Sequence, residues 1–205
     1  KKLKNIEPDL LTIDHPSDLA VEAFRSLRTS LHFAMLDAKN NIIAISGPSP
    51  GVGKSFVSVN LGSVIAQGDK KVLIIDGDMR RGDLQEHLAM HFDAGLTGYL
   101  SGQYKLDEVI RSSSVEGMDI IPRGIVAPNP AELLMHQRFN DLVNYASEKY
   151  DYVIIDTPPI LAVTDPSIIA SYAGTTLIVA RYGITQRREL EITQKRFEQN
   201  GVDIK

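Results

Sequence analysis

The 205-residue chain contains no cysteine, which excludes disulfide bonds, thiolate nucleophiles and cysteine-ligated zinc or iron–sulfur centres. It also lacks an uninterrupted apolar run of the roughly 18 to 20 residues that a transmembrane helix needs, and no signal peptide opens it. Positive charge is not in excess, because 22 Lys and Arg against 26 Asp and Glu give a net charge of −4. The composition therefore predicts no general attraction to nucleic acid or anionic lipid, so a polyanionic ligand would need a local site.

The rest of the composition is typical of a folded, soluble domain. Hydrophobic residues make up 43% and charged residues 23%, both near the averages for globular domains. At roughly 150 residues per domain, we expect one domain over 15–205, preceded by a tail over 1–14. Lys1, Lys2 and Lys4 would lie against anionic lipid if a membrane segment preceded them, and a solvated tail is the alternative. Because the chain begins with lysine rather than methionine, we expect it to be part of a longer protein.

Strand-like and helix-like segments alternate along the chain. Short, continuously apolar runs predict strands covered on both faces, as in a parallel sheet, at 42–45, 72–75, 118–121, 152–155 and 175–179. The clearest helix signals lie at 17–36, 54–67, 136–149 and 185–200. We therefore expect an α/β three-layer domain with a mostly parallel central sheet flanked by helices, and ligands beyond the carboxyl ends of the strands.

A glycine-rich loop follows the first expected strand and leads into an apolar helix, with the sequence Gly47-Pro-Ser-Pro-Gly-Val-Gly-Lys54-Ser55. In such a P-loop the backbone N–H groups converge on phosphate oxygens, the lysine reaches the β- and γ-phosphates, and the hydroxyl binds Mg²⁺. Pro48 stands where the general pattern has its first glycine, so the loop is a variant, and a plain Gly/Pro turn is the alternative. We expect a P-loop NTPase fold that binds a nucleoside triphosphate. The residues expected to hold it are Gly51, Val52, Gly53, Lys54, Ser55 and Phe56.

Carboxylates follow two other expected strands, where the sheet edge would bring them near the P-loop. Asp76 and Asp78 come after the second strand, and Asp156 after the fourth. Asp156 is positioned to hold Mg²⁺ directly or through water, while the pair can supply a second carboxylate and a base. On an extended strand Asp76 and Asp78 would point to one side, where like charges favour a bound cation or a raised pKa. Turn or helix-cap roles are the alternative for each aspartate alone.

These motifs resemble those of a known family. The segment Asp76-Gly-Asp78-Met-Arg80 is similar to the Walker A′ motif, and Ile-Ile-Asp156-Thr-Pro-Pro to the Walker B motif, of the Wzc-like bacterial tyrosine kinases of capsule and exopolysaccharide export. Further similar segments lie at 22–28, 122–124, 129–134 and 180–182. The resemblance implies an ATP- and Mg²⁺-dependent kinase that autophosphorylates tyrosines between neighbouring subunits of a ring, as the cytoplasmic domain of a bacterial inner-membrane protein.

The resemblance also assigns roles to the motif residues. Lys54 matches the catalytic Walker A lysine, and Ser55 and Asp156 match Mg²⁺ ligands. Asp76 and Asp78 match the acidic pair that handles metal and activates the tyrosine hydroxyl. Activation is needed because a phenol with a pKa of about 10 is a poor nucleophile at neutral pH. We expect Asp76 to act as base or orienter and Asp78 at the metal, and the spacing leaves the reverse order open.

The implied partners are a homo-oligomeric ring, the tyrosine-rich tails of neighbouring subunits, a cognate tyrosine phosphatase and the polysaccharide export machinery, with no role for nucleic acid. The family's C-terminal tyrosine cluster is absent, because Tyr182 is the last tyrosine and the chain ends at Lys205. We therefore expect weak autophosphorylation. Some relatives also carry a tyrosine after the Walker A′ arginine and glycine, where this chain has Asp83, so no regulatory tyrosine is expected there.

A charged stripe matches the family's subunit-contact motif. Glu22, Arg25 and Arg28 recur at a spacing of three beside the apolar stripe of the first long helix. By itself this pattern indicates a solvated face with a weak intrahelical ion pair. The resemblance instead implies an interface between ring subunits.

Two other classes of protein are alternatives. A ParA/MinD-like ATPase would share the fold, but that class carries a signature lysine five positions before the P-loop lysine, where this chain has Ser49. A non-catalytic, nucleotide-gated scaffold would not need the acidic motifs. Ser49 and the acidic motifs therefore favour the kinase.

Overall fold

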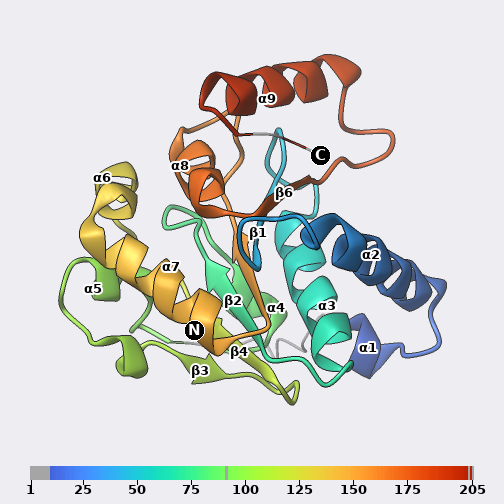
Figure 1. The fold of residues 1–205 in the computed structure, drawn as a ribbon, viewed down its shortest axis with the longest axis horizontal. Coiled ribbons are helices and arrows are strands. Elements are labelled where there is room, and N and C mark those ends of the chain that lie inside the picture. The colour runs from blue at the N-terminus through green and yellow to red at the C-terminus, as the bar shows by residue number, and fades with distance from the viewer. Residues whose placement is uncertain (1–9, 91, 203, 205) are drawn as a thin grey trace, which may run out of the picture.

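The computed structural model describes residues 10–90, 92–202 and 204 as an α/β domain built on a central sheet (Figure 1). The strands are β1 (Ile42–Ser46), β2 (Val72–Asp76), β3 (Arg111–Ser112), β4 (Met118–Ile121), β5 (Tyr152–Asp156) and β6 (Thr175–Ile178). The five strands expected from the sequence are all present, and their ends differ from the expected ends by at most one residue. Strand β3 was not expected, because a run of two residues carries no periodicity.

The described strands form one sheet in the order β3-β4-β2-β5-β1-β6. Strand β3 pairs antiparallel with β4, and the other neighbours pair in parallel, which confirms the mostly parallel sheet. Strands β2, β5 and β1 are therefore adjacent, and their carboxyl ends meet at one edge. The register places Asp76 of β2 directly beside Asp156 of β5.

Helices flank the sheet, as expected. They are α1 (Leu11–Asp14), α2 (Leu19–Met35), α3 (Lys54–Ala66), α4 (Leu84–His87), α5 (Leu96–Leu100), α6 (Pro130–Met135), α7 (Gln137–Lys149), α8 (Asp165–Tyr172) and α9 (Arg187–Gln199), with a 3-10 helix η1 (Leu106–Glu108). The four expected helices correspond to α2, α3, α7 and α9, with ends within two residues of the expected ends. The others are short, and their sequences give a weaker periodic signal.

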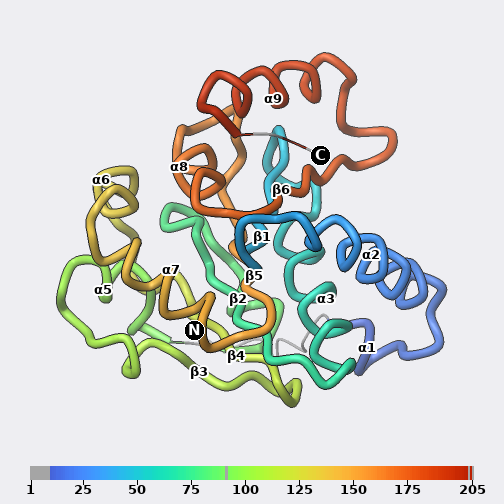
Figure 2. The backbone as a smooth tube through the Cα atoms, viewed as in Figure 1, coloured from blue at the N-terminus to red at the C-terminus, as the bar shows by residue number. Residues whose placement is uncertain are grey.

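The strand residues divide the core between the two faces of the sheet. In β1, Ile43 and Ile45 pack with residues of α2, α3 and α4, while Ile42 and Ala44 pack with residues of α5 to α9. Figure 2 shows α2 running beside α3, on the other side of the sheet from α7. Helix α3 lies between the sheet and α2 and is buried over most of its length, which explains why its apolar residues are not confined to one face.

The structure corrects the expected boundary of the N-terminal tail. Leu10 is fully buried, Leu11 N donates to Asn60 Oδ1 at 2.9 Å, and the hydroxyls of Thr12 and Ser63 are hydrogen bonded. Residues 10–14 therefore belong to the folded domain, because α1 packs against α3. The three lysines of the expected tail lie outside the described residues.

Helix α2 begins at Leu19 because Asp18 caps it, with the side chain accepting a hydrogen bond from Ala20 N at 2.8 Å. We expect Asp18→Ala to lower the free energy of unfolding by about 1 kcal/mol, because an N–H of the first turn loses its partner. Urea denaturation measures this change. The matched control is Ser17→Ala, which changes the neighbouring exposed residue and should have little effect. Equal stability of the two variants would contradict the capping role.

Among the described residues, none of the helices combines the length and the apolar content needed to span a bilayer.

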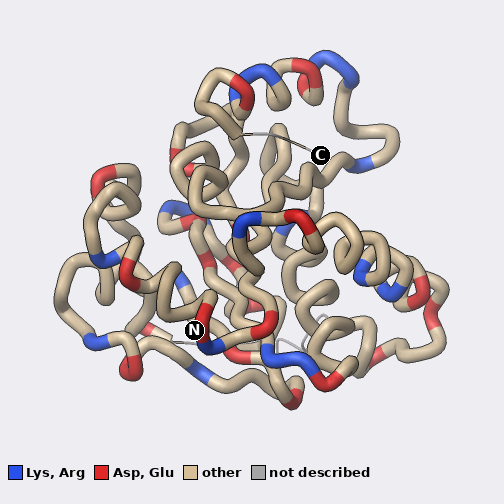
Figure 3. Tube along the Cα trace, in the orientation of Figure 1, with Lys and Arg blue, Asp and Glu red and all other residues tan. Residues whose placement is uncertain are grey.

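Figure 3 shows acidic and basic residues interspersed along α9. Arg187 and Glu191 form an ion pair there at 2.9 Å, and both side chains are exposed. Because exposed pairs contribute little to stability, α9 is held mainly by its apolar contacts, among them the fully buried Phe197.

Candidate active site

The glycine-rich loop joins β1 to α3 in the conformation that its glycines permit. Gly51 and Gly53 have φ angles of 73° and 99°, in the left-handed region that favours glycine. At Gly47 a Cβ would lie 2.9 Å from Val179 O, so only glycine allows this close approach. Lys54 is the first residue of α3 and is only 8% exposed. The loop and the helix N-terminus therefore form a phosphate-binding geometry around this lysine.

The loop is also held from the far end of the chain. Ser49 Oγ donates to Glu189 Oε1 at 2.6 Å, and Arg181 Nη1 donates to Gly51 O at 3.2 Å. Ser49 occupies the position of the ParA/MinD signature lysine. In this chain that position bonds to α9 of the same domain.

Ser55 and Asp156, both expected at the metal, lie together. Ser55 Oγ donates to Asp156 Oδ2 at 2.8 Å. Ser58 Oγ lies 3.0 Å from Asp156 Oδ1 and also 3.0 Å from Lys54 O, and its single proton serves one of them at a time. Sequence reasoning missed Ser58. Its position one helical turn after Lys54 was the available signal.

Burial of two adjacent carboxylates dominates the electrostatics. Burial raises the pKa of Asp156 to about 7, against the hydrogen bond from Ser55, the Lys54 charge and the hydrogen bond from Ser58. The pKa of Asp76 is raised well above its usual range, first by burial and then by the charges of Asp156 and Asp78. Two buried acids side by side favour a bound cation or a shared proton.

Asp76 is fully buried, and its Oδ2 has no hydrogen-bond partner within the described ranges. Its Oδ1 accepts a hydrogen bond from Asp78 N at 3.2 Å. The turn after β2 covers it, because a Cβ at Gly82 would collide with the carboxylate. Gly82 therefore permits the close approach of this turn to Asp76.

Asp78 lies in the turn rather than on the strand. Strand β2 ends at Asp76, and Asp78 Oδ1 accepts hydrogen bonds from Arg80 N at 3.1 Å and Arg81 N at 2.9 Å. The expectation that Asp76 and Asp78 extend to one side of a strand is therefore wrong, because the chain turns after Asp76. The two carboxylates remain close enough for the charge of Asp78 to raise the pKa of Asp76.

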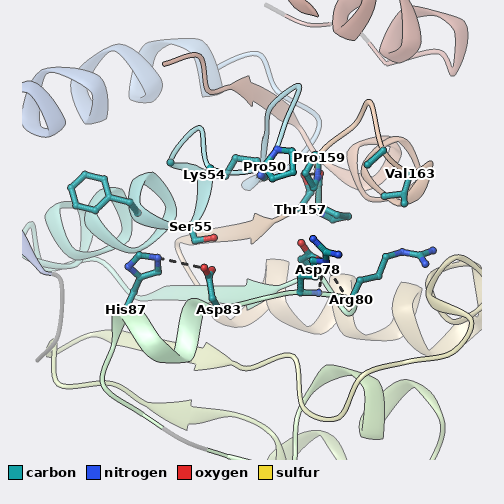
Figure 4. A pocket seen from close by; sticks show the side chains of 16 residues that line it. Pro50, Lys54, Ser55, Asp78, Arg80, Asp83, His87, Thr157, Pro159 and Val163 are labelled. Carbon is teal, nitrogen blue, oxygen red and sulfur yellow. Dashed lines mark hydrogen bonds and ion pairs between the residues drawn. The ribbon is translucent and has the colours of Figure 1, made fainter. Parts of the chain in front are cut away.

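A cavity of about 670 Å³ lies at these strand ends (Figure 4). Its walls come from the P-loop and start of α3 (within 50–56), the turn after β2 with α4 (within 78–87), and the loop after β5 (within 157–163). Lys54, Ser55, Phe56 and Asp78 line it, and the last wall is mainly apolar. The cavity can therefore take a polar phosphate chain at the P-loop and an apolar ring beside it.

Several cavity residues were given no role by the sequence. Arg80, Arg81 and His87 line the cavity, and His87 Nε2 lies 4.0 Å from Asp83 Oδ1 (Figure 4). Arg80 is ion-paired with Asp165, 85 residues away in the sequence. No local pattern signals such a pair, because Arg80 lies in the turn after β2 and its partner lies at the start of α8.

The expected contact motif lies on α2, on the outside of α3. Arg25 forms an exposed ion pair with Glu22, as the sequence predicted for a solvated face. Arg28 differs, because its Nη1 donates to Val64 O of α3 at 2.9 Å. None of the three residues lines the cavity at the strand ends.

The donor set of the site fits Mg²⁺. The available groups are oxygens: the Ser55 hydroxyl, the Asp156 carboxylate and the orphaned Oδ2 of Asp76. Across the described ranges, no three acidic or imidazole side chains form a preformed metal cage. Mg²⁺ does not need one, because it is usually held by one or two carboxylates together with substrate phosphates.

A P-loop between β1 and α3, with carboxylates from two neighbouring strand ends, defines a nucleotide-binding α/β domain of the P-loop class. A family profile described as an AAA domain matches residues 40–185. The septum site-determining protein MinD of Pyrococcus horikoshii, solved with Mg-ADP, is 23% identical with a TM-score of 0.67; it covers 80% of this chain and 67% of its own. This likeness shows the shared fold.

Closer relatives define the family. The chain is 52% identical over 204 residues to tyrosine-protein kinase ptk of Acinetobacter johnsonii, covering 100% of this chain and 28% of that protein. The solved kinase domain of the Escherichia coli tyrosine kinase ETK matches with 48% identity and a TM-score of 0.94, covering 100% of this chain and 80% of that chain. The chain therefore belongs to the bacterial tyrosine kinase family, and the family resemblance read from the sequence is confirmed.

Proposed function

We propose that this domain binds ATP with Mg²⁺ and transfers the γ-phosphate to tyrosine hydroxyls. The observation that carries the proposal is the hydrogen bond between Ser55 of α3 and Asp156 of β5, with the buried Asp76 beside Asp156 and Lys54 at the first position of α3. Membership of the tyrosine kinase family supports the choice of acceptor. The chain spans only 28% of the length of the ptk relative. That a longer protein containing this domain is a tyrosine kinase is therefore also a proposal.

The chemistry needs one bond made and one broken. The phenol oxygen of the acceptor attacks the γ-phosphorus, the bond to the oxygen bridging the β- and γ-phosphates breaks, and ADP leaves. Lys54 and the loop N–H groups hold the phosphates, as the loop geometry supports. Ser55 and Asp156 would hold Mg²⁺, which would stabilise the negative charge on the transferring group. A carboxylate accepts the phenol proton.

The burial of the acids favours the reverse of the order expected from the sequence, in which Asp76 was the base or orienter and Asp78 lay at the metal. Asp78 lines the cavity, whereas Asp76 lies behind the turn beside Asp156. We therefore assign Asp78 to the acceptor hydroxyl and Asp76 to the metal side. Under this assignment Asp76→Asn weakens Mg²⁺ binding by the nucleotide complex more than Asp78→Asn does. Calorimetric titration measures both affinities. A larger loss of Mg²⁺ affinity in Asp78→Asn than in Asp76→Asn would mean that the two roles are reversed.

One assay separates the kinase from its alternatives. The domain is incubated with Mg²⁺, γ-labelled ATP and a tyrosine-rich peptide, with a phenylalanine-substituted peptide as control. Phosphotyrosine on the first peptide alone supports the kinase. Release of phosphate without phosphotyrosine would support a ParA/MinD-like ATPase instead. Absence of both products, with ATP bound, would support a nucleotide-gated scaffold.

We further propose that the domain works as the cytoplasmic part of an inner-membrane protein of polysaccharide export. In this proposal subunits form a ring, the tyrosine-rich tails of neighbouring subunits are acceptors, and a cognate tyrosine phosphatase reverses the modification. Phosphorylation would then regulate polysaccharide synthesis and export. The family membership supports these partners.

The ring predicts an effect of the α2 charges. We expect the double variant Arg25→Ala and Arg28→Ala to reduce the assembled mass measured by light scattering, because the contact motif loses both cations. Arg28 also bonds to α3, so the single variant Arg25→Ala serves as a control that removes only an exposed ion pair and leaves the contact between α2 and α3 intact. Unchanged assembly in the double variant, with the domain folded, would count against this interface.

A further inference from the structure

A buried carboxylate holds Arg80 at the cavity wall. Arg80 Nε donates to Asp165 Oδ2 at 3.0 Å, and its Nη2 donates to Asp165 Oδ1 at 3.4 Å. The Asp165 side chain is fully buried at the start of α8, whereas the Arg80 side chain is 41% exposed. Burying a carboxylate without a partner costs free energy, so breaking this ion pair is unfavourable. The two bonds therefore hold the Arg80 guanidinium in one orientation.

The backbone of Arg80 is fixed as well. Its N–H donates to Asp78 Oδ1 at 3.1 Å, and its carbonyl oxygen accepts a hydrogen bond from Arg123 Nη1 at 3.4 Å. A guanidinium has five N–H donors, and the bonds to Asp165 use two of Arg80's. The described residues supply no other hydrogen bond to this guanidinium. The remaining donors of this partly exposed side chain are therefore free, and Arg80 is one of the residues that line the cavity.

The position of Arg80 suits a phosphoryl group. It lies beside the apolar wall formed by the loop after β5, and Figure 4 shows it on the side of Val163, while Lys54 and Ser55 lie toward the other side. The P-loop can supply hydrogen-bond donors to the phosphates only from its own side of the cavity. In the transfer step the negative charge spreads over the three outer oxygens of the moving group, and a guanidinium fork matches such oxygens.

We propose that Arg80 binds an outer oxygen of the phosphoryl group during transfer and that Asp165 is the positioning residue that aims Arg80 at it. The proposal rests on the proposed function for the identity of the reaction. Under this proposal the contact between Arg80 and the phosphoryl oxygen is stronger in the transition state than with bound ATP. Loss of Asp165 should therefore lower kcat more than it changes nucleotide affinity.

The first test is independent of turnover. We expect Asp165→Asn to weaken binding of ADP with Mg²⁺ and aluminium fluoride, which imitates the moving phosphoryl group, at least about 10-fold. Binding of ADP with Mg²⁺ alone should change less than about 3-fold. Isothermal titration calorimetry measures both. Equal weakening of both ligands, or no weakening of either, would overturn the proposal.

A double-mutant cycle then distinguishes positioning from a structural role. With the tyrosine-rich peptide, Asp165→Asn and Arg80→Ala should each lower kcat about 10- to 100-fold, and the double variant should be no worse than Arg80→Ala alone. Additive losses would mean that Asp165 acts independently of Arg80, which contradicts the proposal. Glu191→Gln is the matched control, because it removes a carboxylate from an exposed arginine pair on α9.

These experiments distinguish failure of the proposed kinase function from failure of the proposed role of Asp165. If the wild-type domain makes no phosphotyrosine, the proposed function fails, while the binding test still decides the role of Asp165. If Asp165→Asn does not fold, Arg80→Lys replaces it, because lysine retains the charge beside Asp165 but not the forked geometry. Arg80→Lys should then lose at least about 10-fold in affinity for the aluminium fluoride complex. An unchanged affinity would overturn the proposal.

Discussion

Lys54→Met is expected to lower the rate of phosphotyrosine formation at least about 100-fold, the loss typical when a preorganised charge is removed from a transferring group. The lysine is 8% exposed at the start of α3, where the P-loop turns its backbone N–H groups toward the phosphate site. Methionine keeps much of the side-chain volume but removes the cation. Phosphotyrosine formed per minute on the peptide measures the change.

Thermal unfolding must accompany this assay, because an unfolded variant would be inactive for another reason. Lys149→Met is the matched control, since it changes an exposed lysine at the end of α7, far from the P-loop in the sequence. We expect the control to retain wild-type activity. A folded Lys54→Met variant with more than about a tenth of wild-type activity would contradict the assigned role of the lysine.

The second large effect concerns stability. Without metal or nucleotide, the free energy of unfolding should fall as the pH rises from about 4 to about 7, and Asp156→Asn should remove much of this fall. The reason is that the folded-state pKa of Asp156 is raised to about 7 from 3.8. In this window the folded state holds a proton that the unfolded chain has lost. The contribution of Asp156 to stability therefore decreases with rising pH and levels off above the folded-state pKa of Asp156.

The size of this effect follows from the pKa shift. One pKa unit corresponds to about 1.4 kcal/mol, so the shift of Asp156 sets an upper bound of about 4 kcal/mol. Replacing Asp156 by asparagine also removes a charge that raises the pKa of Asp76. Urea denaturation in EDTA at pH 5 and pH 8 measures the difference between the wild type and Asp156→Asn.

A matched variant tests whether the effect belongs to the buried pair. Asp151→Asn changes a carboxylate just before β5, outside the cavity, and should leave the pH dependence close to that of the wild type. Adding Mg²⁺ and ATP should raise the free energy of unfolding of the wild type at pH 8, because a bound cation offsets the charges of the two carboxylates. Parallel pH profiles for the wild type and Asp156→Asn would refute the electrostatic account.

Local patterns in the sequence determined most of the fold and the chemical character of the site. Continuous apolar runs predicted five strands, and the loop ending in Lys54-Ser55 predicted the phosphate site, because glycine content and apolar periodicity act over a few residues. The aspartates after the strands predicted acids near that loop, since parallel strands end at one edge. The motif order also identified the family.

Only the tertiary structure decided which of these groups meet. The strand order brings Asp76 beside Asp156, and the turn after β2 separates Asp78 from the strand while burying Asp76. Asp165 reaches Arg80 from a helix 85 residues further along the chain. Such contacts depend on how distant elements pack, and residue spacing along the chain carries no information about that packing.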